Sequence, residues 1–165
     1  MSENPEYHLL PQPHELSEQE KEDAMGAYLM MFAAIGAGLP LPVINIIAAV
    51  VYYYLNKGKS RFVRFHCHQA LFSQLPTSLM NAGALFWGVR IFFSDEWHFN
   101  NVYTGYLGTV VVFNIVYFVW GIMAAIQARK GRTYYISFFG RWSYQRAFAI
   151  KPERAVKQAV NMPPV

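Results

Sequence analysis

Residues 56–70 have the sequence Asn-Lys-Gly-Lys-Ser-Arg-Phe-Val-Arg-Phe-His-Cys-His-Gln-Ala and separate two long apolar stretches of the chain. The first half of this segment carries four cations: Lys57, Lys59, Arg61 and Arg64. Loops rich in lysine and arginine stay on the cytoplasmic side of a membrane. The segment therefore predicts a membrane protein and indicates which side of the bilayer this loop faces.

Outward from this segment, the sequence predicts an all-α, polytopic integral membrane protein with about four short transmembrane helices. Residues 24–55 contain no charge, and this run is longer than the roughly 20 residues that one crossing needs. Glycines and prolines at 36–42 predict a break within it. The expected helices are 17–38, 43–55, 62–93 and 102–128. Three spans with a re-entrant or kinked first pair remain the alternative.

Three further cations, Arg129, Lys130 and Arg132, follow the last apolar stretch. Both basic groups then lie on the cytoplasmic side, which places both termini there in a multi-pass membrane protein. We expect a flexible acidic tail over 1–16, a membrane helical domain over 17–142 and a basic cytoplasmic tail over 143–165. Ser17 and Glu20 have the spacing of a capping box. The polar, mostly acidic start predicts no cleaved signal peptide.

The sequence lacks the motifs of common enzymes, such as Gly-x-Ser-x-Gly or a phosphate-binding loop, and has no acidic residue between Ala24 and Ser94. His66 and His68 are two residues apart, so on a helix they point about 200° from each other and do not readily share one metal ion. A single cysteine excludes an intramolecular disulfide. We therefore predict no catalytic residues, no cofactor, no metal site and no nucleic-acid partner.

Uncharged polar and aromatic side chains within the apolar stretches are candidates for interhelical or partner contacts. The seven cations of the two basic groups serve orientation first, and are also candidates for contacts with lipid headgroups or a partner. The candidates for interhelical contacts are Phe65, His66, Gln69, Asn81 and Asn114, and those for headgroup contacts are Lys57, Lys59, Arg61, Arg64, Arg129, Lys130 and Arg132.

The motif over 61–70, the run Ala-Ala-Ile-Gln-Ala-Arg-Lys-Gly at 124–131, and the aromatic steps at 134–135 and 138–140 occur in a fixed order. Together they resemble a small bacterial membrane-protein family related to the twenty-kilodalton component of Tic, the protein-import machinery of the chloroplast inner envelope. The resemblance covers most of residues 40–142 and implies a location in a bacterial cytoplasmic (inner) membrane.

This resemblance implies a non-enzymatic accessory subunit of an inner-membrane assembly, acting in protein translocation or insertion. Its partners would be membrane lipids and either integral membrane proteins or further copies of the chain. Two alternatives fit the residues: a structural subunit of a respiratory or secretion complex, and a small oligomeric transporter or channel.

Overall fold

The structure, a computed structural model, describes residues 7–33, 42–93 and 100–150. Apart from an isolated bridge between Tyr7 and Ala149, the regular structure of these residues is helical, which confirms the all-α prediction. The elements are α1 (Glu18–Leu29), the 3-10 helix η1 (Met30–Phe32), α3 (Pro42–Asn56), α4 (Arg61–Phe93), α5 (Asn101–Arg129) and α6 (Ser137–Phe148).

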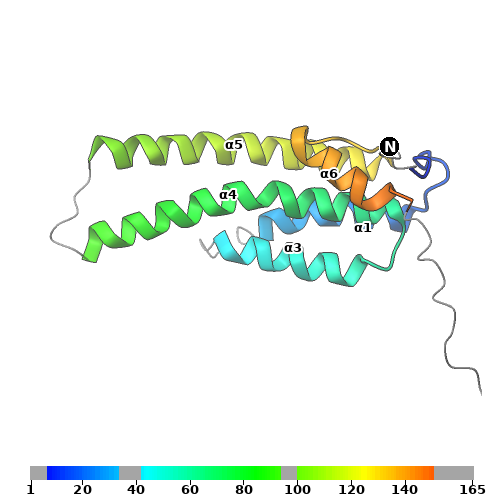
Figure 1. Cartoon of the computed structure of the whole chain (residues 1–165), viewed down its shortest axis with the longest axis horizontal. Helices are drawn as coiled ribbons and strands as arrows, with labels where there is room; N and C mark the ends of the chain where they lie inside the picture. Colours follow the sequence, from blue (N-terminus) through cyan, green and yellow to red (C-terminus); the bar gives the residue numbers. More distant parts are fainter. Residues whose placement is uncertain (1–6, 34–41, 94–99, 151–165) are drawn as a thin grey trace, which may run out of the picture.

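Helices α4 and α5 form a long hairpin, and the shorter helices lie around one half of it (Figure 1). With a rise of about 1.5 Å per residue, α4 extends about 50 Å and α5 about 43 Å. Helices α1 and α3 accompany the half that begins at Arg61 and ends at Arg129. In the described part of the chain, the other half consists of α4 and α5 alone. The hairpin is thus longer than a hydrocarbon core of roughly 30 Å.

Helix α5 is the single described helix that is both long enough and apolar enough to cross a membrane. Only 22% of its most apolar stretch is buried inside the protein. A core helix of a soluble protein would be mostly buried, whereas α5 exposes side chains such as Val111, Phe113 and Ile115. Length and composition therefore support one crossing, and they leave the predicted number of four unconfirmed.

The first predicted helix, 17–38, begins as expected but is α-helical over only the first part of that range. The capping box is confirmed: the Glu20 backbone N–H donates to Ser17 Oγ over 3.2 Å, and the Ser17 N–H donates to the Glu20 carboxylate over 2.9 Å. The α-helix ends at Leu29 and continues as the 3-10 helix η1. The predicted break at 36–42 lies almost entirely outside the described residues.

Small side chains let α1 and α5 pack closely. Ala24 and Ala27 of α1 and Ala124 and Ala128 of α5 belong to one core cluster, and each is at most 2% exposed. Gly121 lies beneath the ring of Phe32, where a Cβ atom would come within 3.0 Å of Cζ. In a membrane, where helices gain little from leaving lipid, such close backbone approach is a main source of helix association.

Two segments that were predicted as tails make contacts in the structure. We predicted a flexible tail over 1–16, yet the Tyr7 ring stacks on Tyr144 at 5.0 Å and the His8 N–H donates to the Phe148 carbonyl over 2.9 Å. Leu16 is buried in the core. We did not predict α6, which crosses the boundary that we placed between 142 and 143. Residues that flank the membrane domain in sequence thus pack together at one end of it.

Candidate functional site

The most highly connected group of buried polar side chains is centred on Gln69 of α4. Its Nε2 donates to Tyr28 Oη and to the Tyr134 carbonyl, both over 2.7 Å. Its Oε1 accepts from the Ile136 N–H over 3.2 Å. Tyr28 Oη in turn lies 2.9 Å from His66 Nδ1. We call these five residues the Gln69 cluster; it joins α1, α4 and the segment between α5 and α6.

The hydrogen bonds of the Gln69 cluster determine which atoms of its side chains carry protons. Gln69 Oε1 faces a backbone donor, so the amide orientation is fixed and Nε2 donates to Tyr28. The Tyr28 hydroxyl therefore donates its own proton to His66 Nδ1, and the neutral imidazole carries its hydrogen on Nε2. His66 Nε2 is buried and has no hydrogen-bond partner among the described residues. This arrangement holds three parts of the chain together.

Phe65 fixes α6 against α4. Its ring is fully buried and lies 5.5 Å from the Tyr135 ring and 6.3 Å from the Phe148 ring, measured between centroids. On the same side, the Arg64 guanidinium donates to the Ala147 carbonyl over 3.1 Å. The segment that opened the sequence analysis therefore positions α6 as well as contributing to the Gln69 cluster.

His66 and His68 occupy different surroundings. The His66 ring contacts Phe62 at 4.5 Å, whereas the His68 ring lies 4.9 Å from Tyr53 of α3. Cys67, between them, is also buried. Among the described residues, no three His, Cys, Asp or Glu side chains are grouped so that they could hold a metal ion. The two histidines thus pack against aromatic rings of different parts of the chain.

Further along the hairpin, Asn81 of α4 and Asn114 of α5 exchange two hydrogen bonds of 3.0 Å, each amide donating to the other. Toward the far end, Tyr106 Oη donates to the Met80 carbonyl over 2.8 Å, and Tyr103 Oη donates to the Ala84 carbonyl over 3.2 Å. The two tyrosine bonds link the part of α4 and α5 that the shorter helices do not cover, whereas the asparagine pair lies beside Phe32 and Asn45.

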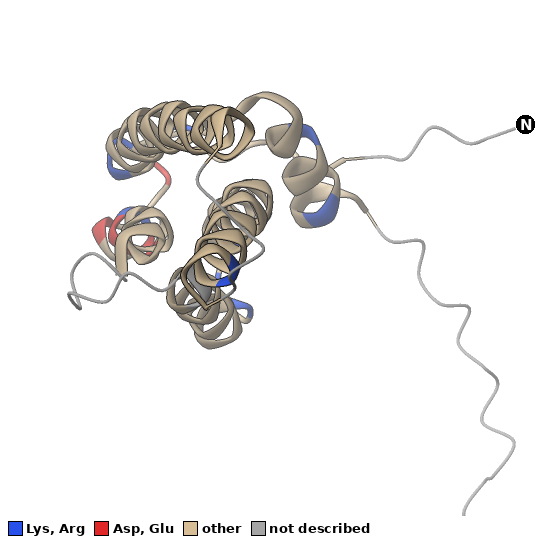
Figure 2. Cartoon of the chain, turned by 90° about the vertical axis from the view of Figure 1, so that its left-hand side faces the viewer, with Lys and Arg blue, Asp and Glu red and all other residues tan. Residues whose placement is uncertain are grey.

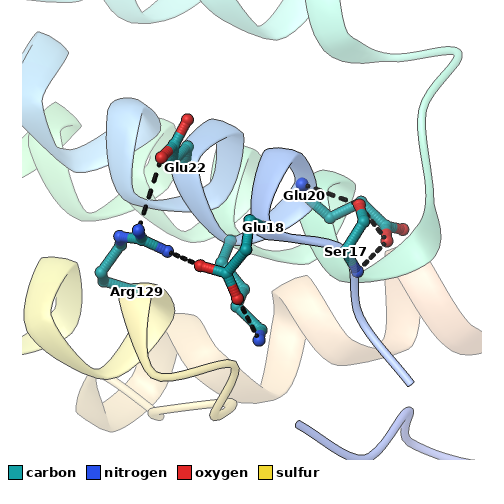
Figure 3. Close-up of polar contacts among 6 residues, drawn as sticks. Ser17, Glu18, Glu20, Glu22 and Arg129 are labelled. Atoms are coloured by element: carbon teal, nitrogen blue, oxygen red, sulfur yellow. Dashed lines mark hydrogen bonds and ion pairs between the residues drawn. The ribbon is translucent and has the colours of Figure 1, made fainter. Parts of the chain in front are cut away.

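Two of the seven cations form salt bridges with carboxylates of α1. Arg129, at the end of α5, pairs with Glu18 and Glu22 (Figure 3), and Lys59 Nζ lies 2.7 Å from the Asp23 carboxylate. The acidic first half of α1 therefore holds the basic loops through ion pairs within the chain. This role was missed in the sequence analysis, which treated the acidic residues and the basic loops separately.

The remaining cations differ in their contacts. Lys57 lies over the Tyr54 ring at 4.9 Å. Arg61, Lys130 and Arg132 are exposed and form no salt bridge with a described residue. Figure 2 shows acidic residues, in red, on α1 and basic residues, in blue, on α6. The end of the bundle where α5 ends and α1 begins thus presents positive charge without a described salt bridge beside ion pairs formed within the chain.

The Glu18 ion pair predicts a pH dependence. Hydrogen bonds from Lys21 and Arg129 lower the pKa of Glu18 from 4.5 to about 2. Because the folded state lowers this pKa, its stabilising contribution is present above pH 4.5 and is lost as the pH falls toward 2. We expect the melting temperature in detergent to fall less over this range in Glu18→Gln than in the native chain. The effect is small because the carboxylate is exposed.

A Glu15→Gln variant is the matched control, since the Glu15 carboxylate accepts from the Gln12 backbone N–H and forms no salt bridge with α5 in the described part of the chain. It should retain the native pH dependence. Identical pH profiles for the native chain and Glu18→Gln would show that this ion pair contributes nothing.

Several residues of the site carried no recognisable signal in the sequence. Tyr28, Tyr103 and Tyr106 are tyrosines within apolar stretches, and only their positions opposite a glutamine or a helix carbonyl make them polar contacts. Tyrosine hydroxyls that are buried normally find such partners. That rule could have marked them as candidates, but not named their partners.

The family comparison changes the assignment made from the motifs. The profile of the magnetosome magnetite crystal formation protein family, MamF/MmsF, matches residues 20–143. This range extends from α1 into α6 and covers more than half of the chain. No curated protein and no solved structure matches the chain.

The resemblance to a family related to the chloroplast import component is therefore wrong, and the role in protein translocation that it implied has no support. The motifs that suggested it, a basic loop, small residues in a span and aromatic residues at its end, are what any small membrane helix hairpin requires. The chain belongs to the magnetosome magnetite crystal formation protein family and is a membrane-associated bacterial protein.

Proposed function

We propose that the protein is a non-enzymatic, multi-pass component of the magnetosome membrane that acts in magnetite crystal formation as an accessory subunit of a membrane assembly. The observation that carries this proposal is the family match over residues 20–143. Because the match includes every described helix in whole or in part, the proposal concerns the entire helical domain.

The absence of an enzymatic role is supported by how the polar groups are used. The side chains of Gln69, Tyr28 and His66 bond to one another or to the backbone, and the acidic residues Glu18 and Asp23 pair with cations. A general acid or base must instead reach a substrate. The protein would act by organising its membrane surroundings.

The length and surface of the hairpin support two full crossings, by α4 and α5. The far half of α4 exposes Leu79, Phe86 and Phe92, so it presents an apolar surface even though α4 contains more polar residues than α5. The basic ends of both helices would face the cytoplasm. Helix α3 extends only about 22 Å, so the pair of α1 and α3 would reach part of the way into the bilayer from that side.

Cysteine labelling in intact and opened membrane vesicles tests this topology. In a Cys67→Ala background, single cysteines at Ser2 and at Lys130 should react from the cytoplasmic side, and one at Asn100 only from the opposite side. Labelling of Ser2→Cys from the side opposite to Lys130→Cys would contradict the placement of both ends on the cytoplasmic side.

Removal of the gene from a magnetite-forming bacterium tests the function. We expect electron microscopy to show a change in the number or dimensions of the crystals, restored by the native chain. Gln69→Leu should restore them poorly, because the Gln69 cluster holds the domain together, whereas Gln12→Leu, at an exposed glutamine outside that cluster, should restore them fully. Unchanged crystals after removal of the gene would refute the proposal.

A further inference from the structure

Helix α6 has two faces of opposite character. Gly140, Ser143 and Ala147 lie on the buried face against α4. On the other face, Phe138 is 65% exposed and Trp142 is 50% exposed, with their rings 5.2 Å apart. At least half of the surface of each of these two large aromatic side chains is therefore exposed. Exposed tryptophan and other aromatic side chains beside a membrane-spanning helix are typical of the membrane interface.

Cations flank the exposed aromatic pair on both sides. At about 100° per residue, Arg141 lies about 60° to one side of Phe138 and Arg146 about 40° beyond Trp142. Neither arginine forms a salt bridge with a described residue. The sequence contains no acidic residue from 97 to 152. This face of α6 is thus complementary to a negatively charged partner.

The exposed face of α6 continues onto α4. Trp142 lies 6.5 Å from the Phe72 ring, and the Arg146 guanidinium lies 6.0 Å from the same ring. These three side chains line a hollow of about 610 Å³. Beyond Phe72, at helical spacing, Leu75 and Leu79 of α4 are 47% and 75% exposed. The aromatic and basic face therefore lies at the cytoplasmic end of an apolar stripe.

We propose that α6 lies in the headgroup layer of the bilayer and binds anionic phospholipid. Phe138 and Trp142 contact the upper acyl chains, and Arg141 and Arg146 contact the phosphates. The continuity with the apolar stripe of α4 favours lipid over an acidic protein segment, because that stripe would face acyl chains. The proposal rests on the membrane crossing by α5 given under the proposed function.

Depth-dependent quenching of tryptophan fluorescence tests the position of α6. The chain is reconstituted into vesicles of phosphatidylcholine and phosphatidylglycerol that contain lipids spin-labelled near the headgroup or deep in the acyl chain. With Trp142 as the only tryptophan, the shallow label should quench more strongly than the deep one. With Phe113→Trp as the only tryptophan, the order should be reversed, because position 113 is half exposed and lies about 24 Å along α5 from Arg129.

The two tryptophans separate the failure of this inference from the failure of the proposed topology. If the deep label quenches the tryptophan at 113 and neither label quenches Trp142, the lipid contact of α6 is overturned and the crossing by α5 stays intact; a protein partner for this face would then be the better explanation. If neither label quenches the tryptophan at 113, the crossing is refuted and the inference with it.

Lipid selectivity tests the role of the arginines. Spin-labelled phosphatidylglycerol should quench Trp142 more than spin-labelled phosphatidylcholine does. Each cation near an anionic surface contributes about 1 kcal/mol to the binding of anionic lipid. The preference for phosphatidylglycerol should therefore fall by roughly fivefold or more in an Arg141→Gln/Arg146→Gln variant. A Lys57→Gln/Lys130→Gln variant removes the same charge elsewhere and should retain it. Equal loss in both variants, or no preference in the native chain, would overturn the assignment of these arginines.

Discussion

Replacing Gln69 with leucine is expected to lower the stability of the domain by on the order of 3 kcal/mol. The leucine fills a similar volume but leaves the Tyr134 carbonyl and the Ile136 N–H without their partner, and Tyr28 Oη loses a donor. Each buried polar group left unpaired costs about 1–3 kcal/mol. Unfolding in mixed micelles of sodium dodecyl sulfate and a mild detergent, followed by circular dichroism, measures the loss.

Gln145→Leu is the matched control for this prediction, because Gln145 is an exposed glutamine on α6. It should change the free energy of unfolding by no more than about 0.5 kcal/mol. If Gln69→Leu were no less stable than this control, the Gln69 cluster would not be what holds α1, α4 and the segment before α6 together.

Gly140→Ala is expected to detach α6 from α4. A Cβ atom at position 140 would lie 2.6 Å from Tyr135 Cδ1, 2.7 Å from Tyr135 Cβ and 2.9 Å from Gln69 Oε1. The Tyr135 Cβ atom is joined directly to the backbone, so it cannot move aside without moving the chain. Such overpacking typically costs about 1–3 kcal/mol. The separated helix should then be cleaved faster by trypsin at Arg141 and Arg146, by roughly tenfold or more.

Gly58→Ala is the control for this experiment, since a Cβ atom at position 58 would meet no heavy atom within 4 Å. Cleavage at Arg141 and Arg146 should proceed at the native rate in that variant. A native cleavage rate in Gly140→Ala would mean that α6 tolerates the added methyl group and is not held by this close approach.

The helices themselves could be predicted from the sequence to a large extent. The predicted stretches 43–55, 62–93 and 102–128 lie close to α3, α4 and α5, because uncharged runs bounded by charged or polar breaks specify their own ends. The capping box at Ser17 was equally local, since both partners lie within one turn. Helix α6 was missed because it has only 12 residues, about three turns, within a basic segment that is typical of a tail.

The motif comparison failed for a related reason. A short basic loop, a histidine after an aromatic residue and small residues at four-residue spacing satisfy general requirements of membrane helices. Proteins of different families meet these requirements with similar residues. Only the profile over residues 20–143, which weighs the whole domain, distinguished the families.

The sequence by itself determined the helical class, the position of the long helices and the charged end of the bundle, because each of these depends on residues within a few turns of one another. The tertiary structure decided which polar groups meet. Gln69 contacts Tyr28, Tyr134 and Ile136, which are 41, 65 and 67 residues away. Lys59 and Arg129 turn inward to α1. Such pairings depend on how whole helices pack, and no local spacing encodes them.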